Sequence, residues 1–130
     1  MRFLPAPEPA TVAGVRRALQ NLAVASEGKT HRTVAVLGDL VTGDLTTQDG
    51  ELMDLGRYLV RLDLTSLVVI GSASGQVHAG AVLEGSWGQE SRHVDTFEEA
   101  VALLRGELTP DDVLLVVGAP ALRTALEGAA

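Results

Sequence analysis

Residues 33–39 read Thr-Val-Ala-Val-Leu-Gly-Asp, a short run of apolar, mostly branched side chains that ends in a glycine and a carboxylate. Two further runs have the same form, Leu-Val-Val-Ile-Gly at residues 67–71 and Val-Leu-Leu-Val-Val-Gly at residues 113–118. Runs without polar alternation are buried on both faces, which is typical of parallel sheets covered by helices. The three runs therefore predict central strands of one mainly parallel sheet.

Segments with helical periodicity lie between these runs. Apolar residues at helical spacing predict a first helix from Thr11 to about Gly28. The apolar stripe of a second helix consists of Leu52, Leu55, Leu59 and Leu62. Thr96 and Glu99 match a capping box and predict the start of another helix, and Pro120 suits the start of a last one. We also expect a short helix at residues 74–81 and a brief strand at 93–94.

Strands that alternate with helices predict an α/β layered fold, because parallel neighbours need crossover connections that cover the sheet. The length of 130 residues suits a single domain over residues 1–130. Residues 5–9, with three prolines, predict an extended lead-in, since proline lacks the amide donor of a helix or central strand. Ligands in such sheets bind beyond the carboxyl ends of the strands, which directs attention to Gly38, Gly71 and Gly118.

Composition argues against several classes of function. The formal net charge of -7 is opposite to what a nucleic-acid-binding surface needs. The absence of cysteine excludes disulfides, thiol nucleophiles and thiolate metal sites. No apolar run approaches the roughly 20 residues that span a bilayer, and the N-terminus lacks a secretory core, so we expect a cytoplasmic protein without a membrane span.

Asp39 opens a polar stretch that continues to Gly50, and it is a candidate hydrogen-bond acceptor for a ligand hydroxyl or ammonium. Residues 41–50 would then close over it as a lid; alternatively, Asp39 ties down the amides of its own loop. Asp44 and Asp49 in the same stretch suggest a Mg²⁺ site, but the spacing of these carboxylates does not require one. The three histidines have no metal-ligand spacing and are expected to be ordinary surface residues. No metal ligand is predicted.

Motifs for autonomous catalysis are missing. The chain has no G-x-x-x-x-G-K-[ST] phosphate loop and no G-x-G-x-x-G after a strand. Residues 71–75, Gly-Ser-Ala-Ser-Gly, depart from the nucleophile elbow of hydrolases. No catalytic residue is therefore predicted. Thr42-Gly43-Asp44, followed by two threonines, leaves a small flavodoxin-like cofactor binder as one further reading.

Five segments in this order resemble the C-terminal domain of the Mur ligases, in particular the type that adds D-alanyl-D-alanine. They are residues 9–11, 34–40, 68–71, 97–104 and 112–118. The resemblance covers nearly the whole chain and implies a three-layer, Rossmann-like domain. It also implies a part in ATP-dependent amide ligation during peptidoglycan biosynthesis, the step that builds the cell wall.

In this family the complete ligase uses ATP and Mg²⁺ to form an acyl phosphate. The resemblance thus implies a central ATPase domain and a UDP-binding domain as partners, with no cofactor held by the isolated chain. Because such catalysis needs residues from both sides of a closing cleft, we expect the chain alone to be inactive. The alternative is a stand-alone, non-catalytic interaction or regulatory module that kept the fold and binds a protein partner.

The candidate ligand-binding residues follow the predicted strands. They are Gly38, Asp39, Gly43, Asp44, Gly71 and Gly118. The chain departs from the family at four positions. Where the family has Asn, Asn, Lys and His, this chain has Ala6, Glu8, Val117 and Leu52. These apolar and acidic groups cannot make the contacts of an amide, a cation or an imidazole, so the departures bear on nucleotide and dipeptide binding and not on the fold.

Overall fold

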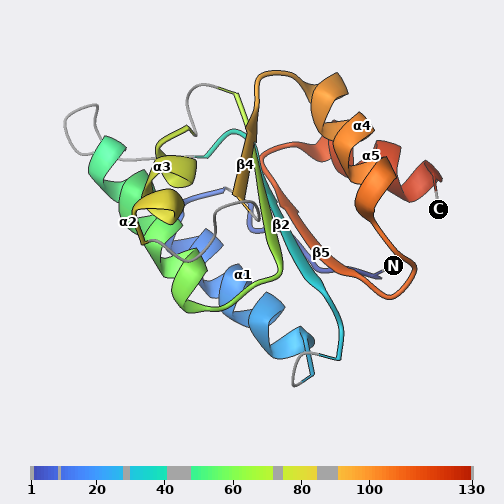
Figure 1. Ribbon diagram of the computed structural model, residues 1–130, viewed down its shortest axis with the longest axis horizontal. Coiled ribbons are helices and arrows are strands. Elements are labelled where there is room, and N and C mark those ends of the chain that lie inside the picture. Colours follow the sequence, from blue (N-terminus) through green and yellow to red (C-terminus); the bar gives the residue numbers. More distant parts are fainter. Residues whose placement is uncertain are drawn as a thin grey trace.

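The structure, a computed structural model, describes residues 2–8, 10–27, 30–40, 48–71, 75–84 and 91–129. Strands and helices alternate along these residues (Figure 1). The elements are β1 (Arg2–Phe3), α1 (Val12–Ala25), β2 (Thr33–Leu37), α2 (Gln48–Arg61), β3 (Ser66–Ile70), α3 (Gly75–Glu84), β4 (Ser91–Val94), α4 (Phe97–Glu107), β5 (Val113–Val117) and α5 (Pro120–Ala129). In the described part of the chain, the strands form one parallel sheet in the order β1-β5-β2-β3-β4. The predicted α/β fold is confirmed.

Helices cover both faces of the sheet. Helices α1, α2 and α3 lie on one face, and α4 and α5 lie on the other (Figure 1). Successive side chains of a strand point to opposite faces, so each central strand serves two cores. In β2, Ala35 and Leu37 belong to the core under α1 to α3, whereas Val34 and Val36 belong to the core under α4 and α5. This double burial is the physical reason for the continuous apolar runs in the sequence.

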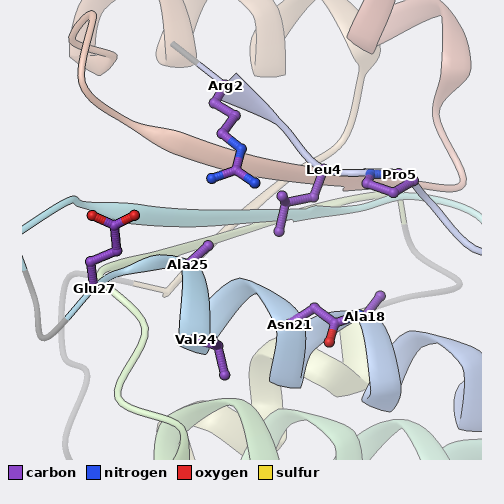
Figure 2. A pocket seen from close by; sticks show the side chains of 8 residues that line it. All are labelled: Arg2, Leu4, Pro5, Ala18, Asn21, Val24, Ala25 and Glu27. Carbon is purple, nitrogen blue, oxygen red and sulfur yellow. The ribbon is translucent and has the colours of Figure 1, made fainter.

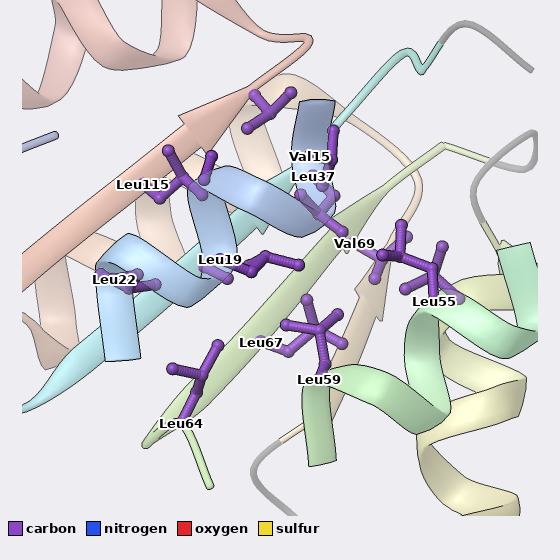
Figure 3. Packing of buried hydrophobic residues seen from close by; sticks show 14 of the residues in the cluster. Val15, Leu19, Leu22, Leu37, Leu55, Leu59, Leu64, Leu67, Val69 and Leu115 are labelled. Atoms are coloured by element: carbon purple, nitrogen blue, oxygen red, sulfur yellow. The ribbon is translucent and has the colours of Figure 1, made fainter. Parts of the chain in front are cut away.

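The larger core lies between the sheet and the helices α1 to α3. Figure 3 shows Leu19 of α1 and Leu55 and Leu59 of α2 beside Leu67 and Val69 of β3. All five side chains are fully buried. Burial of one such side chain stabilises the fold by about 1.5–3 kcal/mol, so this layer supplies much of the driving force for folding.

Two predicted helix starts are confirmed by their caps. The Thr11 hydroxyl accepts a hydrogen bond from the Gly14 amide at 3.1 Å, and the Thr96 hydroxyl accepts one from the Glu99 amide at 3.1 Å. Such caps satisfy amides that have no partner inside the helix. The helix boundaries differ by a few residues: α1 ends at Ala25, and Leu62 lies beyond α2, although it still packs against the larger core.

Residues 2–3, which precede the predicted extended lead-in, form an edge strand that periodicity did not predict. The amides of Arg2 and Leu4 donate to the carbonyls of Asp112 and Leu114, both at 2.9 Å, and this pairing places β1 beside β5. A strand of two residues is too short to show an alternating pattern. The expected helix at 74–81 and strand at 93–94 both exist and are longer than expected.

Helices α2 and α3 approach each other closely through two glycines. A Cβ atom on Gly56 would overlap the Val77 carbonyl oxygen and would lie 2.8 Å from the Ala81 nitrogen. A Cβ atom on Gly80 would overlap the Met53 carbonyl oxygen and would lie 2.8 Å from the Met53 carbonyl carbon. Backbone therefore meets backbone at this crossing, and only glycine leaves room for it.

Among the described residues, none of the helices has both the length and the apolar character that a membrane span requires.

An ion-pair cluster joins β4 to the end of α4. The Arg92 guanidinium donates to both carboxylate oxygens of Glu107, and its NH2 group also donates to the Ser66 hydroxyl at 3.1 Å. The hydrogen bonds from Arg92 hold the pKa of Glu107 below its ordinary value of 4.5. The charged form of Glu107 thus contributes to the stability of the folded state.

We expect Glu107→Gln to lower the free energy of unfolding by up to about 1 kcal/mol at pH 7, because the partly exposed pair is screened by solvent. A lowered folded-state pKa gives stability that is present above pH 4.5 and is lost as the pH falls through the folded-state value. Urea unfolding at pH 7 and pH 3 measures the effect. The gap between wild type and variant should shrink at pH 3; an equal gap at both values would contradict the assignment.

Candidate functional site

The crossover order of the strands defines where the sheet can open a crevice. Strand β2 is followed by α2 on one face, whereas β5 is followed by α5 on the opposite face (Figure 1). Because β2 and β5 are neighbours, the chain leaves their carboxyl ends in opposite directions. Such a switch point is where ligands bind in open parallel α/β sheets.

A pocket of about 290 Å³ lies at this switch point. Its walls come from the segment between β1 and α1, from the carboxyl ends of β2 and β5, and from the first turns of α5. The lining residues are Ala6, Glu8, Ala10, Asp39, Val116, Gly118, Pro120 and Arg123. We call it the switch-point pocket. Two carboxylates and one guanidinium line it among small apolar groups, so it combines both signs of charge.

Gly38, which does not line the pocket, and Gly118 let the chain segments after β2 and β5 approach each other closely. The Gly38 amide donates to the Val117 carbonyl at 2.8 Å, and the Asp39 amide donates to the Gly118 carbonyl at 3.0 Å. Gly118 has a φ of 73°, and a Cβ atom there would overlap the backbone of Asp39. The glycines therefore bring the two strand ends together and place Asp39 on the pocket wall.

Arg123 supplies the pocket with a cation that the sequence motifs did not single out. Its Nε donates to the Glu127 carboxylate at 3.0 Å, and its guanidinium carbon lies 5.4 Å from the centre of the Phe3 ring. NH1 also donates to the Leu4 carbonyl at 3.5 Å. One feature of the sequence could have indicated Arg123 as a site residue: it lies one turn after Pro120, in a helix that begins just after the end of a strand.

The structure brings some predicted site residues together and separates others. Asp39 and Gly118 line the switch-point pocket, as do Ala6 and Glu8, which the resemblance places at family Asn positions. Gly71 is not among the lining residues. Its amide donates to the Val94 carbonyl at 2.9 Å at the end of β3, and its φ is 87°.

The expected lid is only partly described. Gly43 and Asp44, with the rest of residues 41–47, lie outside the described residues, so the lid and its ligand-binding role stay predictions. Residues 48–50 belong to α2. Val117 and Leu52, which stand where the family has Lys and His, are both buried in the larger core. At these two positions the chain has exchanged polar groups for core packing.

A second pocket of about 440 Å³ lies between β1 and α1 (Figure 2). Leu4, Ala18 and Ala25 contribute apolar surface to it, and Arg2 and Glu27 carry the charges at one end. None of the predicted site residues lines this pocket. It is larger than the switch-point pocket but lies on the α1 side of the sheet edge.

Of the three histidines, His78 differs from the expectation of ordinary surface residues, whereas His93 is exposed as expected. His78 is half-buried, and its Nδ1 lies 2.8 Å from the hydroxyl oxygen of buried Ser91. Its ring stacks on that of His93 with centroids 6.1 Å apart. The expectation was wrong for His78, because helix α3 and strand β4 meet there although they are separated in sequence. Among the described residues, no group of three or more His, Asp or Glu side chains could hold a metal ion.

Comparison with known families defines the class of protein to which this fold and site belong. The family described as Mur ligase, glutamate ligase domain, matches residues 10–120. The chain therefore belongs to the Mur ligase C-terminal domain family, and the resemblance seen in the sequence is confirmed.

Two relatives bear the name of one type of ligase. UDP-N-acetylmuramoyl-tripeptide--D-alanyl-D-alanine ligase of Mycobacterium leprae (strain TN) is 38% identical, over 88% of this chain and 25% of that protein. The protein of the same name from Mycobacterium tuberculosis (strain ATCC 25618 / H37Rv) is 39% identical, over 67% of this chain and 19% of its own length. The chain thus spans a quarter or less of these relatives.

A solved structure shows the same fold. MurF from Acinetobacter baumannii aligns with a TM-score of 0.66 and 22% sequence identity, over 90% of this chain and 26% of that chain. At this identity, the similarity concerns the arrangement of strands and helices. It agrees with the three-layer fold and the parallel sheet described above.

Proposed function

We propose that this chain acts as the C-terminal domain of an ATP-dependent amide ligase of the D-alanyl-D-alanine-adding type, in cytoplasmic peptidoglycan synthesis. The match to ligases of that name over 88% of the chain supports the proposal. Because those relatives are about four times as long, the remaining chemistry belongs to other domains, and the partners are a central ATPase domain and a UDP-binding domain.

In this proposal the switch-point pocket binds the incoming dipeptide. D-alanyl-D-alanine is a small zwitterion with an ammonium at one end, a carboxylate at the other and two methyl groups between them. Asp39 and Glu8 suit the ammonium, and the planar guanidinium of Arg123 suits the carboxylate. The convergence of these three charges on a 290 Å³ pocket at the switch point is the observation that carries this assignment.

The chain contributes binding and orientation of the amine. In the complete ligase, ATP would supply the phosphoryl group that activates the carboxylate of the other substrate for amide formation. The described residues offer no side-chain cage for Mg²⁺ and no cation at the family Lys position. Within the described ranges no cluster of three metal-ligating side chains exists, and Val117, at the family Lys position, is fully buried. Nucleotide and Mg²⁺ are therefore assigned to the partner domains. The isolated chain is expected to form no amide bond.

A binding experiment tests the pocket. Titration of the chain with D-alanyl-D-alanine should shift the backbone NMR signals of Asp39 and Gly118. Arg123→Gln should weaken the affinity roughly tenfold or more, since a hydrogen bond between charged groups contributes about 1.5–3 kcal/mol. Arg105→Gln on the exposed side of α4 is the matched control and should leave the affinity unchanged. Equal affinity in wild type and Arg123→Gln would contradict the assignment.

The alternative is a stand-alone, non-catalytic interaction module. It is favoured by the four departures from the family pattern, of which Val117 and Leu52 are buried core residues here. A domain exchange separates the two functions: the chain replaces the C-terminal domain of the Mycobacterium leprae ligase, and amide formation is measured. Ligase activity in the chimera supports the first proposal. A folded but inactive chimera, together with a protein partner for the chain, supports the second.

A further inference from the structure

Two histidines meet where α3, β4 and the end of β3 come together. The rings of His78, on α3, and His93, on β4, are stacked at 6.1 Å with an angle of 28° between their planes. His93 Nε2 lies 2.8 Å from the Gly71 carbonyl oxygen, so this nitrogen carries the proton and donates. His78 Nδ1 lies 2.8 Å from the Ser91 hydroxyl oxygen.

These contacts join three elements through two imidazole rings. His93 ties the carboxyl end of β3 to β4, and His78 ties α3 to the start of β4. The ring of His93 also lies against the beginning of α3, because a Cβ atom on Gly75 would be 3.5 Å from His93 Cε1. The amino end of a helix carries partial positive charge, which disfavours a cation beside it.

We propose that His78 and His93 form an acid-sensitive contact that holds α3 and the end of β3 on β4 while both rings are neutral, and that loosens when both are protonated. Two imidazolium ions at this spacing repel each other, and His93 would also face the amino end of α3. Protonation of both rings brings like charges together between elements that the neutral pair holds in place.

The electrostatic surroundings agree with this role. Burial, and then the neighbouring His93, lower the pKa of His78 from its ordinary value of 6.5. Strand β3 carries no charged side chain. Of the cations on the other packed elements, Arg92 is paired with Glu107 and Arg61 with Glu84, the last residue of α3. The remaining described charges on α2 and α4 are Glu51, Asp54, Arg57, Glu98, Glu99 and Arg105; Asp95 directly follows β4.

The direction of the pH dependence follows from these values. The pKa of His78 is lower in the folded chain than the ordinary value of 6.5. Between these two pKa values, the folded chain binds fewer protons than the unfolded chain. The contribution of neutral His78 to the free energy of unfolding is therefore fully present above about pH 7, and it decreases as the pH falls below 6.5. The Glu107 contribution begins to fall only below pH 4.5, whereas the His78 contribution begins to fall at about pH 6.5.

NMR titration of the histidine Cε1 protons tests the proposal in wild type, His93→Gln and His78→Gln. In wild type, the pKa of His78 should lie below 6.5, and in His93→Gln it should rise. The protection of α3 amides against hydrogen exchange, corrected for the intrinsic rate, should fall severalfold between pH 7.5 and pH 5.5 in wild type. This fall should be smaller in both variants.

His31→Gln is the matched control, because His31 lies between α1 and β2 and contacts Glu27 at 3.4 Å. It should respond to pH as wild type does. An unchanged pKa of His78 in His93→Gln would overturn the proposal, as would equal loss of α3 protection in wild type and both variants. Since His78→Gln removes the charge pair from the other side, the test does not depend on one variant folding.

Discussion

Replacing Gly80 with alanine is expected to lower the free energy of unfolding by about 3 kcal/mol or more. The added methyl group would overlap the Met53 carbonyl oxygen, and the nearest atoms around it all belong to the Met53 backbone. Neither helix can relieve this overlap by moving a side chain, so α3 must shift away from α2. Such a loss is a large part of the about 5–15 kcal/mol that stabilises a domain.

Thermal unfolding followed by circular dichroism measures this effect, and a decrease in melting temperature of roughly 10 °C or more is expected. Gly56→Ala should give a similar decrease, because its methyl group would meet the Val77 backbone from the other helix. Gly106→Ala is the matched control, since in the described part of the chain no atom outside its own helix backbone lies within 4 Å of a Cβ atom there. That variant should be neutral or slightly more stable. Equal behaviour of Gly80→Ala and Gly106→Ala would refute the close crossing.

Gly118→Ala is the second substitution for which we expect a large effect, about 3 kcal/mol in unfolding free energy. Two costs add at this position. The φ of 73° is unfavourable for alanine, and the methyl group would overlap the Asp39 backbone and lie 2.6 Å from its nitrogen. Relief requires the ends of β2 and β5 to separate. Asp39 would then leave its place on the switch-point pocket.

Gly71→Ala separates the two costs. Its φ of 87° is also unfavourable for alanine, but no atom of the described residues beyond its chain neighbours lies within 4 Å of the added carbon. We therefore expect a loss of about 1–2 kcal/mol from backbone strain alone. Chemical denaturation of both variants gives the comparison, and Gly118→Ala should also weaken D-alanyl-D-alanine binding. A Gly118→Ala variant as stable as Gly71→Ala would show that the two strand ends are not in close contact.

The central strands could be predicted from sequence because their burial leaves a strong local signal. Residues 33–37 and 113–117 are strands with the predicted bounds, since a strand buried on both faces has no polar alternation to obscure it. Strand β1 could not be predicted in this way. Its two residues form a strand only because β5 offers an open edge, a contact between the two ends of the chain.

The site was predicted only in part. Asp39 and Gly118 follow strands and were found by position, and both line the switch-point pocket. Arg123 and Glu8 reach the pocket from α5 and from the segment after β1, and no motif connects them. The pairing of His78 with His93 was equally hidden, because it depends on how α3 crosses β4.

Local sequence pattern alone determined the α/β class, the three central strands and the family resemblance, since periodicity and burial act on neighbouring residues. The tertiary structure alone decided the strand order, which groups converge on the switch-point pocket and which glycines sit at backbone contacts. These features arise between segments far apart in the chain. Their geometry is set by packing of whole elements against one another, which no single stretch of residues encodes.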